Sequence, residues 1–195
     1  MLRPALFLDK DGTLIEDVPF NVDPRKMRFS PGAREALARF ATLGVALFVV
    51  SNQAGVALGR FDPARLDDLR EHLSAMFAEC GASLAGAYFC PHHPHGSVAR
   101  YAFDCDCRKP RPGLLLRAAA EHAIDLHRSW MIGDILDDVE AGKRAGCRSV
   151  LVCNGNETEW RGGVFRQPDH LVRDLAEAAR LIEAAWVRPV AGVVA

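Results

Sequence analysis

Apolar residues occur along this chain in short unbroken runs, which alternate with longer stretches where apolar positions recur every three or four residues. The runs are too short for helices and lack polar alternation, so each predicts a strand buried on both faces. These runs span residues 5–8, 45–50, 87–90, 130–132 and 149–152. Strands that alternate with amphipathic helices predict a parallel sheet with helices on both faces, a Rossmann-like doubly wound α/β fold.

The helix expected after residue 30 has the clearest start signal. Ser30 can cap it, Pro31 suits its first turn, and Gly44 follows its last apolar position. Further helices are expected at residues 62–80, 112–123, 137–145 and 174–187. Residues 91–111 and 154–168 have no apolar period and predict loops, the first functional and the second a flexible connection.

Polar residues follow three of the predicted strands. In doubly wound sheets, ligands bind at the carboxyl ends of the strands, so these residues are the candidates for chemistry. They are Asp9, Asp11, Ser51, Asn52, Gly133 and Asp134. We therefore expect side chains that are distant in the sequence to meet in one crevice.

Composition narrows the class of protein. The length of 195 residues and an apolar fraction of 49% predict one globular domain with an insertion rather than a disordered chain. The formal net charge of −1 provides no broad positive field for nucleic acid, so any phosphate must be bound locally. No apolar run suits a signal peptide or a membrane span. We expect a cytoplasmic protein that has neither a membrane nor a nucleic-acid partner, and we expect a monomer.

Asp9 and Asp11 lie two positions apart where the first strand ends, a spacing that can turn both side chains to one side. Adding Asp134, and with it Asp138, gathers several anions whose mutual repulsion favours a bound cation. Carboxylate oxygens suit Mg²⁺ that also binds a substrate phosphate. The acidic residues therefore predict a magnesium site.

Each acidic motif taken alone also fits a turn at residues 9–13 or a helix cap at residues 137–138. Ser51 and Lys109 favour phosphoryl chemistry instead, because a transferring phosphoryl group needs a donor and a cation. A non-catalytic, receiver-like module that only captures Mg²⁺ or phosphate is the alternative of a different class. Such a module needs no acid two residues beyond its phosphorylated carboxylate, so Asp11 favours an enzyme.

Four ordered motifs resemble those of the haloacid dehalogenase (HAD) superfamily of phosphatases. They are Asp9-Lys10-Asp11-Gly12-Thr13, Ser51-Asn52-Gln53, Lys109, and Gly133-Asp134 with Asp138. The resemblance implies the HAD fold in a single hydrolase domain over residues 1–195. Only residues 14–30 lie between the first motif and the first predicted helix, so we expect no large cap domain.

The resemblance also implies roles for individual residues. Asp9 would be the nucleophile that forms an aspartyl phosphate, and Asp11 would protonate the leaving oxygen and then deprotonate water. Mg²⁺ would be held by the carboxylate of Asp9, the backbone carbonyl of Asp11, and Asp134. The substrate contacts in these motifs would be Ser51, Asn52, Gln53 and Lys109.

Cysteines and histidines gather in residues 90–107. The cluster comprises Cys90, His92, His93, His95, Cys105 and Cys107. Three thiolates and one imidazole form a common structural zinc set, and in a reducing compartment a metal site is favoured over disulfides. Spacing alone does not select one of the three histidines, and free thiols are the alternative.

The same cluster resembles the zinc loop of the D-glycero-D-manno-heptose 1,7-bisphosphate phosphatases. The matching positions are Cys90, His92, Cys105 and Cys107. We expect the zinc to be structural and to order the loop that carries Arg108 and Lys109, which would lower the ordering cost of catalysis.

Substrate choice is where this chain departs from that family. Arg108 would contact the part of the substrate beyond the reacting phosphate. Ile135, however, replaces a common lysine, and Val18-Pro19-Phe20 replaces a His-Gly-Tyr stretch. Loss of a cation weakens the case for a second phosphate. We expect a small phosphorylated sugar, foremost the heptose 1,7-bisphosphate, with histidinol phosphate or another small phosphomonoester as the alternative.

Overall fold

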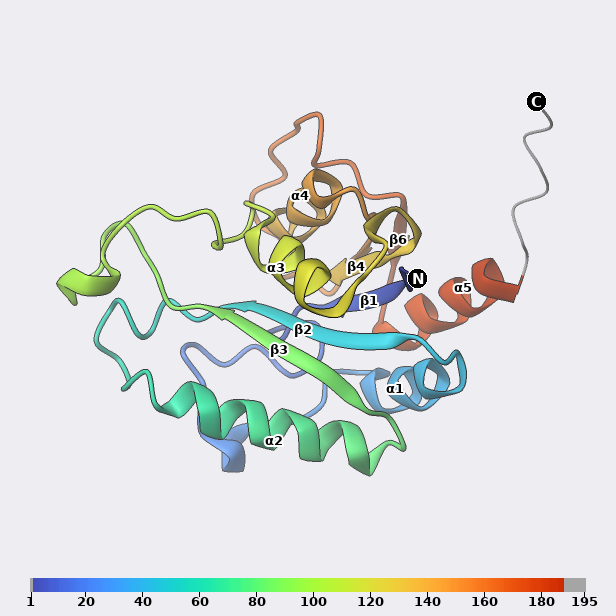
Figure 1. Cartoon of the computed structure of the whole chain (residues 1–195), viewed down its shortest axis with the longest axis horizontal. Coiled ribbons are helices and arrows are strands. Elements are labelled where there is room, and N and C mark those ends of the chain that lie inside the picture. The colour runs from blue at the N-terminus through green and yellow to red at the C-terminus, as the bar shows by residue number, and fades with distance from the viewer. Residues whose placement is uncertain (1, 188–195) are drawn as a thin grey trace.

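The computed structural model describes residues 2–187, and a six-stranded sheet lies at its centre (Figure 1). The strand order is β3-β2-β1-β4-β5-β6, and every neighbouring pair is parallel. The bounds are β1 Ala5–Leu8, β2 Ala46–Asn52, β3 Leu84–Cys90, β4 Trp130–Gly133, β5 Arg148–Val152 and β6 His170–Val172. The predicted parallel α/β sheet is confirmed.

Helices cover both faces of this sheet. The bounds are α1 Ala33–Thr42, α2 Arg65–Glu79, α3 Gly113–His122, α4 Leu136–Ala145 and α5 Leu175–Val187, with 3-10 turns η1 Pro24–Lys26, η2 Ala99–Tyr101 and η3 Leu126–Arg128. The first, second and fifth helices lie on one side, and α3 and α4 lie on the other (Figure 1). No helix within residues 2–187 has the length and apolar character to span a bilayer.

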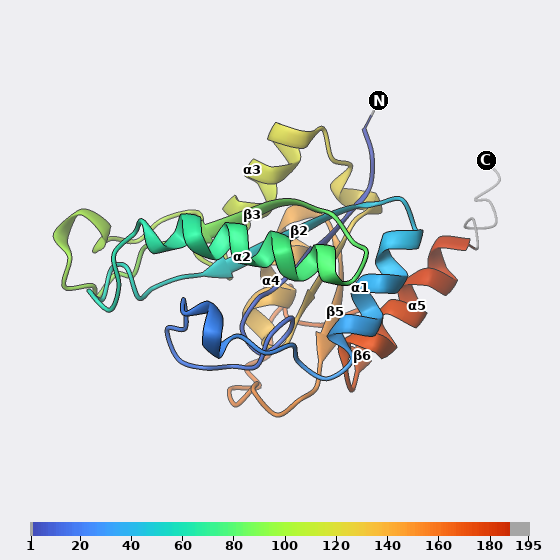
Figure 2. The same ribbon diagram turned by 90° about the horizontal axis from the view of Figure 1, so that it is seen from below.

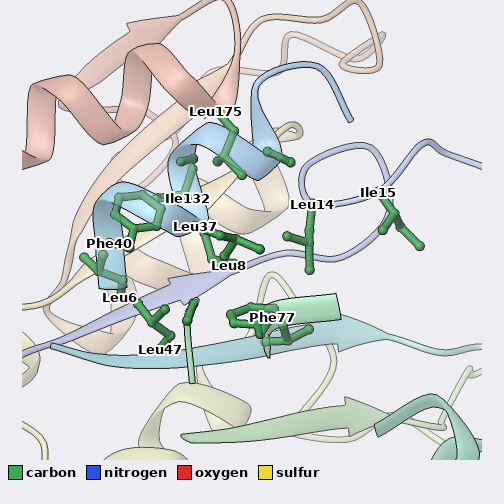
Figure 3. Packing of buried hydrophobic residues seen from close by; sticks show 14 of the residues in the cluster. Leu6, Leu8, Leu14, Ile15, Leu37, Phe40, Leu47, Phe77, Ile132 and Leu175 are labelled. Carbon is green, nitrogen blue, oxygen red and sulfur yellow. The ribbon is translucent and has the colours of Figure 1, made fainter. Parts of the chain in front are cut away.

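Two apolar cores explain why the strands carry no polar alternation. Leu6 and Leu8 of β1 belong to the core between the sheet and the helices α1, α2 and α5, part of which is shown in Figure 3. Ala5 and Phe7 point to the opposite core, where the Phe7 ring stacks on Phe48 with centroids 5.3 Å apart. Burial on both faces makes β1 fully inaccessible and gives its polar continuation, Asp9, a rigid base.

Two details of the sequence-based prediction are wrong. Ser30 does not cap α1: the helix begins at Ala33, after Gly32 in the left-handed conformation at φ 75°, without a side-chain cap. A Cβ at position 32 would lie 2.8 Å from the backbone nitrogen of Ala176, so the approach of α5 requires glycine there. Strand β6 was not predicted, because it is three residues long and only Val172 is buried.

The segments that surround the carboxyl ends of the strands are loops. Residues 9–32 connect β1 to α1 and contain only η1, so no large cap is present in this part of the chain (Figure 2). The loop after β3 extends away from the sheet and carries η2 (Figure 1). These loops, together with the residues that follow β5, enclose the candidate site.

Candidate active site and metal centres

Lys109 lies at the centre of the site, with 3% of its side chain exposed. Its Nζ donates to the carbonyl of Val50 at 3.0 Å, to Asp138 Oδ1 at 2.6 Å and to Asp9 Oδ1. Burial disfavours a charged lysine, but the carboxylates of Asp138 and Asp9 outweigh it and raise the pKa of Lys109. The lysine is therefore a fixed buried cation.

Three carboxylates gather around this cation. Asp9 follows β1, Asp134 follows β4, and Asp138 lies in the first turn of α4; each places one oxygen within 4.8 Å of the others. Burial raises the pKa of Asp134 to about 6, and the charge of Asp9 adds to the effect. Burial likewise raises the pKa of Asp138. Three carboxylates against one ammonium leave a negative surplus, which fits the all-oxygen donor set of Mg²⁺.

The motif glycines are explained by this packing. Gly12 has φ 82°, and a Cβ there would lie 2.1 Å from Asp134 Oδ2. A Cβ at Gly133 would lie 2.2 Å from the Cβ of Asp138. The hydroxyl of Thr13 donates to Asp134 Oδ1 at 2.9 Å. Both glycines thus allow the acidic side chains to approach the backbone closely, and Thr13 orients one of them.

The residues after β5 also belong to the site, which the sequence reasoning missed. Asn156 Nδ2 donates to Asp134 Oδ2 at 2.7 Å, and Asn154 Nδ2 donates to the carbonyl of Gly12 at 2.6 Å. Glu157 accepts from the backbone N–H of Leu136 at 2.6 Å. The interpretation of this loop as a flexible connection is wrong for its first residues. The rule that ligands lie at the carboxyl ends of strands, applied to β5, would have indicated them.

Asp11 stands beside the three-carboxylate cluster rather than within it. Its Oδ1 lies 2.8 Å from Nζ of the buried Lys10, and its Oδ2 accepts from Gln53 Nε2 at 3.2 Å. Burial raises the pKa of Asp11 to about 6, although Lys10 lowers it. This carboxyl can therefore carry a proton close to neutral pH, as an acid–base group must. A magnesium contact through its backbone carbonyl stays a prediction.

Ser51, Asn52 and Gln53 lie at and just beyond the carboxyl end of β2, as expected. Gln53 Nε2 donates to Ser51 Oγ at 2.9 Å. Asn52 pairs with the backbone of Lys109 in both directions, since its Oδ1 accepts from the N–H at 3.0 Å and its Nδ2 donates to the carbonyl at 3.1 Å. Asn52 therefore positions the lysine, while substrate contacts by the three residues stay predictions.

A cavity of about 260 Å³ opens beside these groups, and we call it the site cavity. It is lined by Asp11, Asp17, Val18, Phe20, Asn52, Gln53, Ala54, Gly55 and Arg108. Arg108 and Asp11 therefore line the same cavity as Val18 and Phe20, two of the positions where this chain differs from the heptose phosphatase pattern. A larger cavity, about 520 Å³, lies against α2 and contains none of the predicted site residues, so size does not identify the site.

The second centre gathers four of the six predicted candidates from the cysteine- and histidine-rich loop. The four residues are Cys90, His92, Cys105 and Cys107, whose ligand atoms lie within 4.8 Å of one another. Cys105 Sγ lies 3.3 Å from Cys107 Sγ, which lies 3.3 Å from His92 Nδ1. The hydrogen bond between Cys90 and Cys107 lowers the pKa of Cys107 to about 5 and raises the pKa of Cys90, so the contact favours the thiolate at one of these two sulfur atoms.

The structure thus selects one histidine, because His93 and His95 stay outside the group. Three sulfur atoms and one imidazole nitrogen fit Zn²⁺. The centre also contacts the active-site loop directly: Arg108 donates to the carbonyl of His92 at 3.5 Å, and Arg111 donates to the carbonyl of Cys105 at 2.7 Å. The cysteine-rich loop and the segment that carries Lys109 therefore form one connected structure.

The fold is that of the HAD-like phosphatases. A family model described as HAD-hydrolase-like matches residues 106–178, which include Lys109, Asp134 and Asp138. The D,D-heptose 1,7-bisphosphate phosphatase of B. bronchiseptica, solved with magnesium and phosphate, superposes with a TM-score of 0.79 at 30% identity, covering 93% of this chain and 99% of that one. The chain is a phosphoric monoester hydrolase of this superfamily.

Relatives of similar sequence identify the family within this superfamily. The D-glycero-beta-D-manno-heptose-1,7-bisphosphate 7-phosphatase of Yersinia pestis is 38% identical over 94% of this chain and 97% of its own length. That of Escherichia coli K12 is 41% identical over 78% of this chain and 80% of its own length. The chain belongs to the D-glycero-β-D-manno-heptose-1,7-bisphosphate 7-phosphatase family, which confirms the resemblance seen in its motifs.

Proposed function

We propose that this chain is a Mg²⁺-dependent phosphatase that converts D-glycero-β-D-manno-heptose 1,7-bisphosphate to the 1-phosphate through an aspartyl phosphate. The observation that carries the proposal is the convergence of Asp9, Asp134 and Asp138 on the buried Lys109. The names of the relatives and the magnesium and phosphate bound in the B. bronchiseptica structure support it.

In the first step, a carboxylate oxygen of Asp9 attacks phosphorus in line, and the bond from phosphorus to the sugar oxygen breaks. Asp11 gives its proton to that leaving oxygen. In the second step, Asp11 takes a proton from water, whose oxygen attacks phosphorus and releases Asp9 and inorganic phosphate. Lys109 Nζ donates a hydrogen bond to Asp9 Oδ1 and so keeps that carboxylate oriented.

Asp9, Asp134 and the backbone carbonyl of Asp11 would hold Mg²⁺, with Asp138 beside them. The bound ion supplies charge neutralisation, which allows a phosphate dianion to approach several carboxylates. Thr13 and Asn156 each donate to one oxygen of Asp134 and so leave its orientation little freedom.

Zinc in the Cys90, His92, Cys105 and Cys107 set would be structural, as part of one hydrolase domain. It would hold the loop whose backbone Asn52 binds, and so keep Lys109 and Arg108 in place. Thiolate ligands persist under reducing conditions, which supports action in the cytoplasm. One chain contains the whole site, so we propose a monomer, which light scattering after size exclusion would test.

Histidinol phosphate is the second candidate substrate. Val18 and Phe20 give the site cavity an apolar wall, which offers no hydrogen bonds to the hydroxyl groups of a heptose. The wall would instead accept a small, less hydroxylated substrate.

Phosphate release with Mg²⁺ present would test both candidates. The substrates are the heptose bisphosphate, the heptose 7-phosphate, histidinol phosphate and a generic aryl phosphate, and the Asp9→Asn variant measures contamination. We expect the highest kcat/KM for the bisphosphate. A higher kcat/KM for histidinol phosphate would make it the substrate in place of the heptose bisphosphate. No phosphate release from any of the esters would reject the proposed phosphatase activity.

A further inference from the structure

A second cleft, of about 240 Å³, adjoins the site cavity, and we call it the basic cleft. Val18 and Phe20 line both cavities, so the two cavities are neighbours. None of the predicted catalytic, substrate or metal residues lines the basic cleft. It is therefore a distinct cavity next to the site cavity.

Four cations line this cleft against one carboxylate. Arg25 is bonded to that carboxylate, Asp23, at 3.0 Å, and Arg65 is paired with Asp68, outside the cleft, at 2.9 Å. Lys26 and Arg60 have no ion-pair partner among residues 2–187. A surplus of positive charge in a chain of net charge −1 marks this cleft as suited to an anion.

A buried donor without a partner lies in the same cleft. Asn21 is 6% exposed, and its Oδ1 accepts from the N–H of Asp23 at 3.0 Å, which fixes the orientation of the amide. Its Nδ2 is buried and has no hydrogen-bond partner within residues 2–187. A buried N–H without an acceptor is costly, and an oxyanion in the cleft would supply that acceptor.

Phe20, at the border, is held in an unfavourable conformation. Its φ is 56°, in the left-handed region that bulky side chains rarely adopt. The guanidinium of Arg60 lies 5.7 Å from the centre of its ring. The strained backbone keeps an aromatic wall beneath Arg60, which leaves the donor groups of that arginine available to a ligand.

We propose that the basic cleft is a second anion site that binds a phosphate group, with Lys26 and Arg60 as its cations and Asn21 Nδ2 as its buried donor. Phosphate oxygens accept hydrogen bonds from arginine guanidinium groups and from amide N–H groups. The phosphate has two sources: the uncleaved phosphate of a bisphosphate substrate, which rests on the proposed function, or free inorganic phosphate, which does not.

NMR titration with inorganic phosphate tests the site itself. The reporters are the side-chain amides of Asn21 in the basic cleft and of Gln53 in the site cavity. In the parent we expect both resonances to shift. In Lys26→Met/Arg60→Met, the Asn21 shift is lost and the Gln53 shift is kept. An Asn21 resonance that does not respond, or that responds equally in this variant, overturns the proposal.

The matched control is Arg100→Met/Arg128→Met. Both arginines are exposed, neither lines the basic cleft, and Arg100 also lies over an aromatic ring, 4.8 Å from the centre of Tyr101. This double variant removes the same amount of charge from a different surface. It should keep the parent's Asn21 response, and its loss would show a general charge effect that overturns the proposal.

Kinetics distinguish the two sources of the phosphate. If the substrate supplies it, Lys26→Met/Arg60→Met raises KM for the heptose bisphosphate about tenfold over the control and leaves the heptose 7-phosphate and the aryl phosphate unchanged. If free phosphate is the ligand, KM is unchanged for every ester while the Asn21 response is lost. An equal rise in KM for the aryl phosphate means that the site cavity is disturbed, which overturns a separate site. A parent that does not hydrolyse the bisphosphate rejects the proposed function, while the titration still tests the cleft.

Discussion

The carboxylate cluster and the cysteine cluster of this chain are built in opposite ways. The carboxylates come from distant parts of the chain, Asp9 after β1 and Asp134 and Asp138 around the start of α4, and all three are buried. The four zinc-type ligands all come from residues 90–107: Cys90 ends β3, and the other three lie in the loop that follows, whose only regular element is η2. One cluster is assembled by the sheet, and the other is local.

This difference indicates where each centre obtains its rigidity. Strands with a core on both faces hold the carboxylates whether or not a metal is bound, because the strands are ordered by apolar packing. The cysteine loop rests on the core under α3 and α4 only at its base, where Cys90 is buried and Cys105 and Cys107 are partly buried. Metal binding would supply the free energy that orders it. Asn52 connects the two regions.

The largest expected effect comes from the carboxylate side. Asp9→Asn should lower kcat at least about 10³-fold, because an amide is a poor nucleophile. The fold should persist, since Lys109 keeps Asp138 as a partner. Phosphate release and urea unfolding measure the two effects. Activity within tenfold of the parent would remove Asp9 from the nucleophile role.

Loss of the zinc centre should first make the loop after β3 less ordered and, as a consequence, lower the activity. Cys107→Ser should lower the bound zinc, make the loop after β3 sensitive to protease, and lower kcat about 10- to 100-fold, because Lys109 loses its support. Metal analysis, limited proteolysis and phosphate release are the measurements.

Cys153→Ser is the matched control, since this cysteine is exposed and outside the cluster. It should leave metal content, proteolysis and activity unchanged. If Cys107→Ser behaves like this control, the zinc loop has no structural role.

The link between the two regions should have an intermediate effect. Asn52→Ala removes both bonds to the backbone of Lys109, and we expect about 1–3 kcal/mol less stability and about tenfold lower kcat. Bound zinc should be retained. Asn52→Asp keeps the acceptor for the N–H and should fall between the parent and Asn52→Ala. Equal kcat in all three would mean that the clusters are independent.

The smallest expected effect is a difference between the two clusters in how they respond to pH. Burial raises the pKa of Asp134 to about 6 in the folded state, above its unfolded value, so the folded state binds more protons between about pH 4 and 6. In Mg²⁺-free buffer, the contribution of Asp134 to the free energy of unfolding therefore falls as pH rises through that window. Asp134→Asn should flatten this dependence relative to the parent.

Zinc affinity should change with pH in the opposite direction, because protons compete with the metal for thiolates and imidazole as pH falls. Urea unfolding of the parent and Asp134→Asn, with zinc content measured at each pH, checks both signs. Identical pH profiles for the two proteins would mean that Asp134 is ionised in the folded state throughout.

Much of the site was predictable because the responsible signals are local. The runs that became β1 and β4 ended at Asp9 and Asp134, and the shared geometry of parallel strands predicted their meeting. The cysteine spacing indicated a metal site. The contacts of Asn154 and Asn156 were not predicted, since an asparagine in a polar loop looks the same whether or not it contacts a buried carboxylate.

The amino-acid sequence by itself determined the parallel sheet, the order of the motifs and the residue types at the two centres, because strand burial and ligand chemistry depend on local composition. The resemblance had indicated His92 as the histidine that joins the cysteines, and the tertiary structure agrees. Only the tertiary structure decided that Asn52 is hydrogen-bonded to the backbone of Lys109 and that, within residues 2–187, Asn21 is left with a buried unpaired donor in the basic cleft. These outcomes depend on the positions of atoms from several segments, and those positions are set when the chain packs.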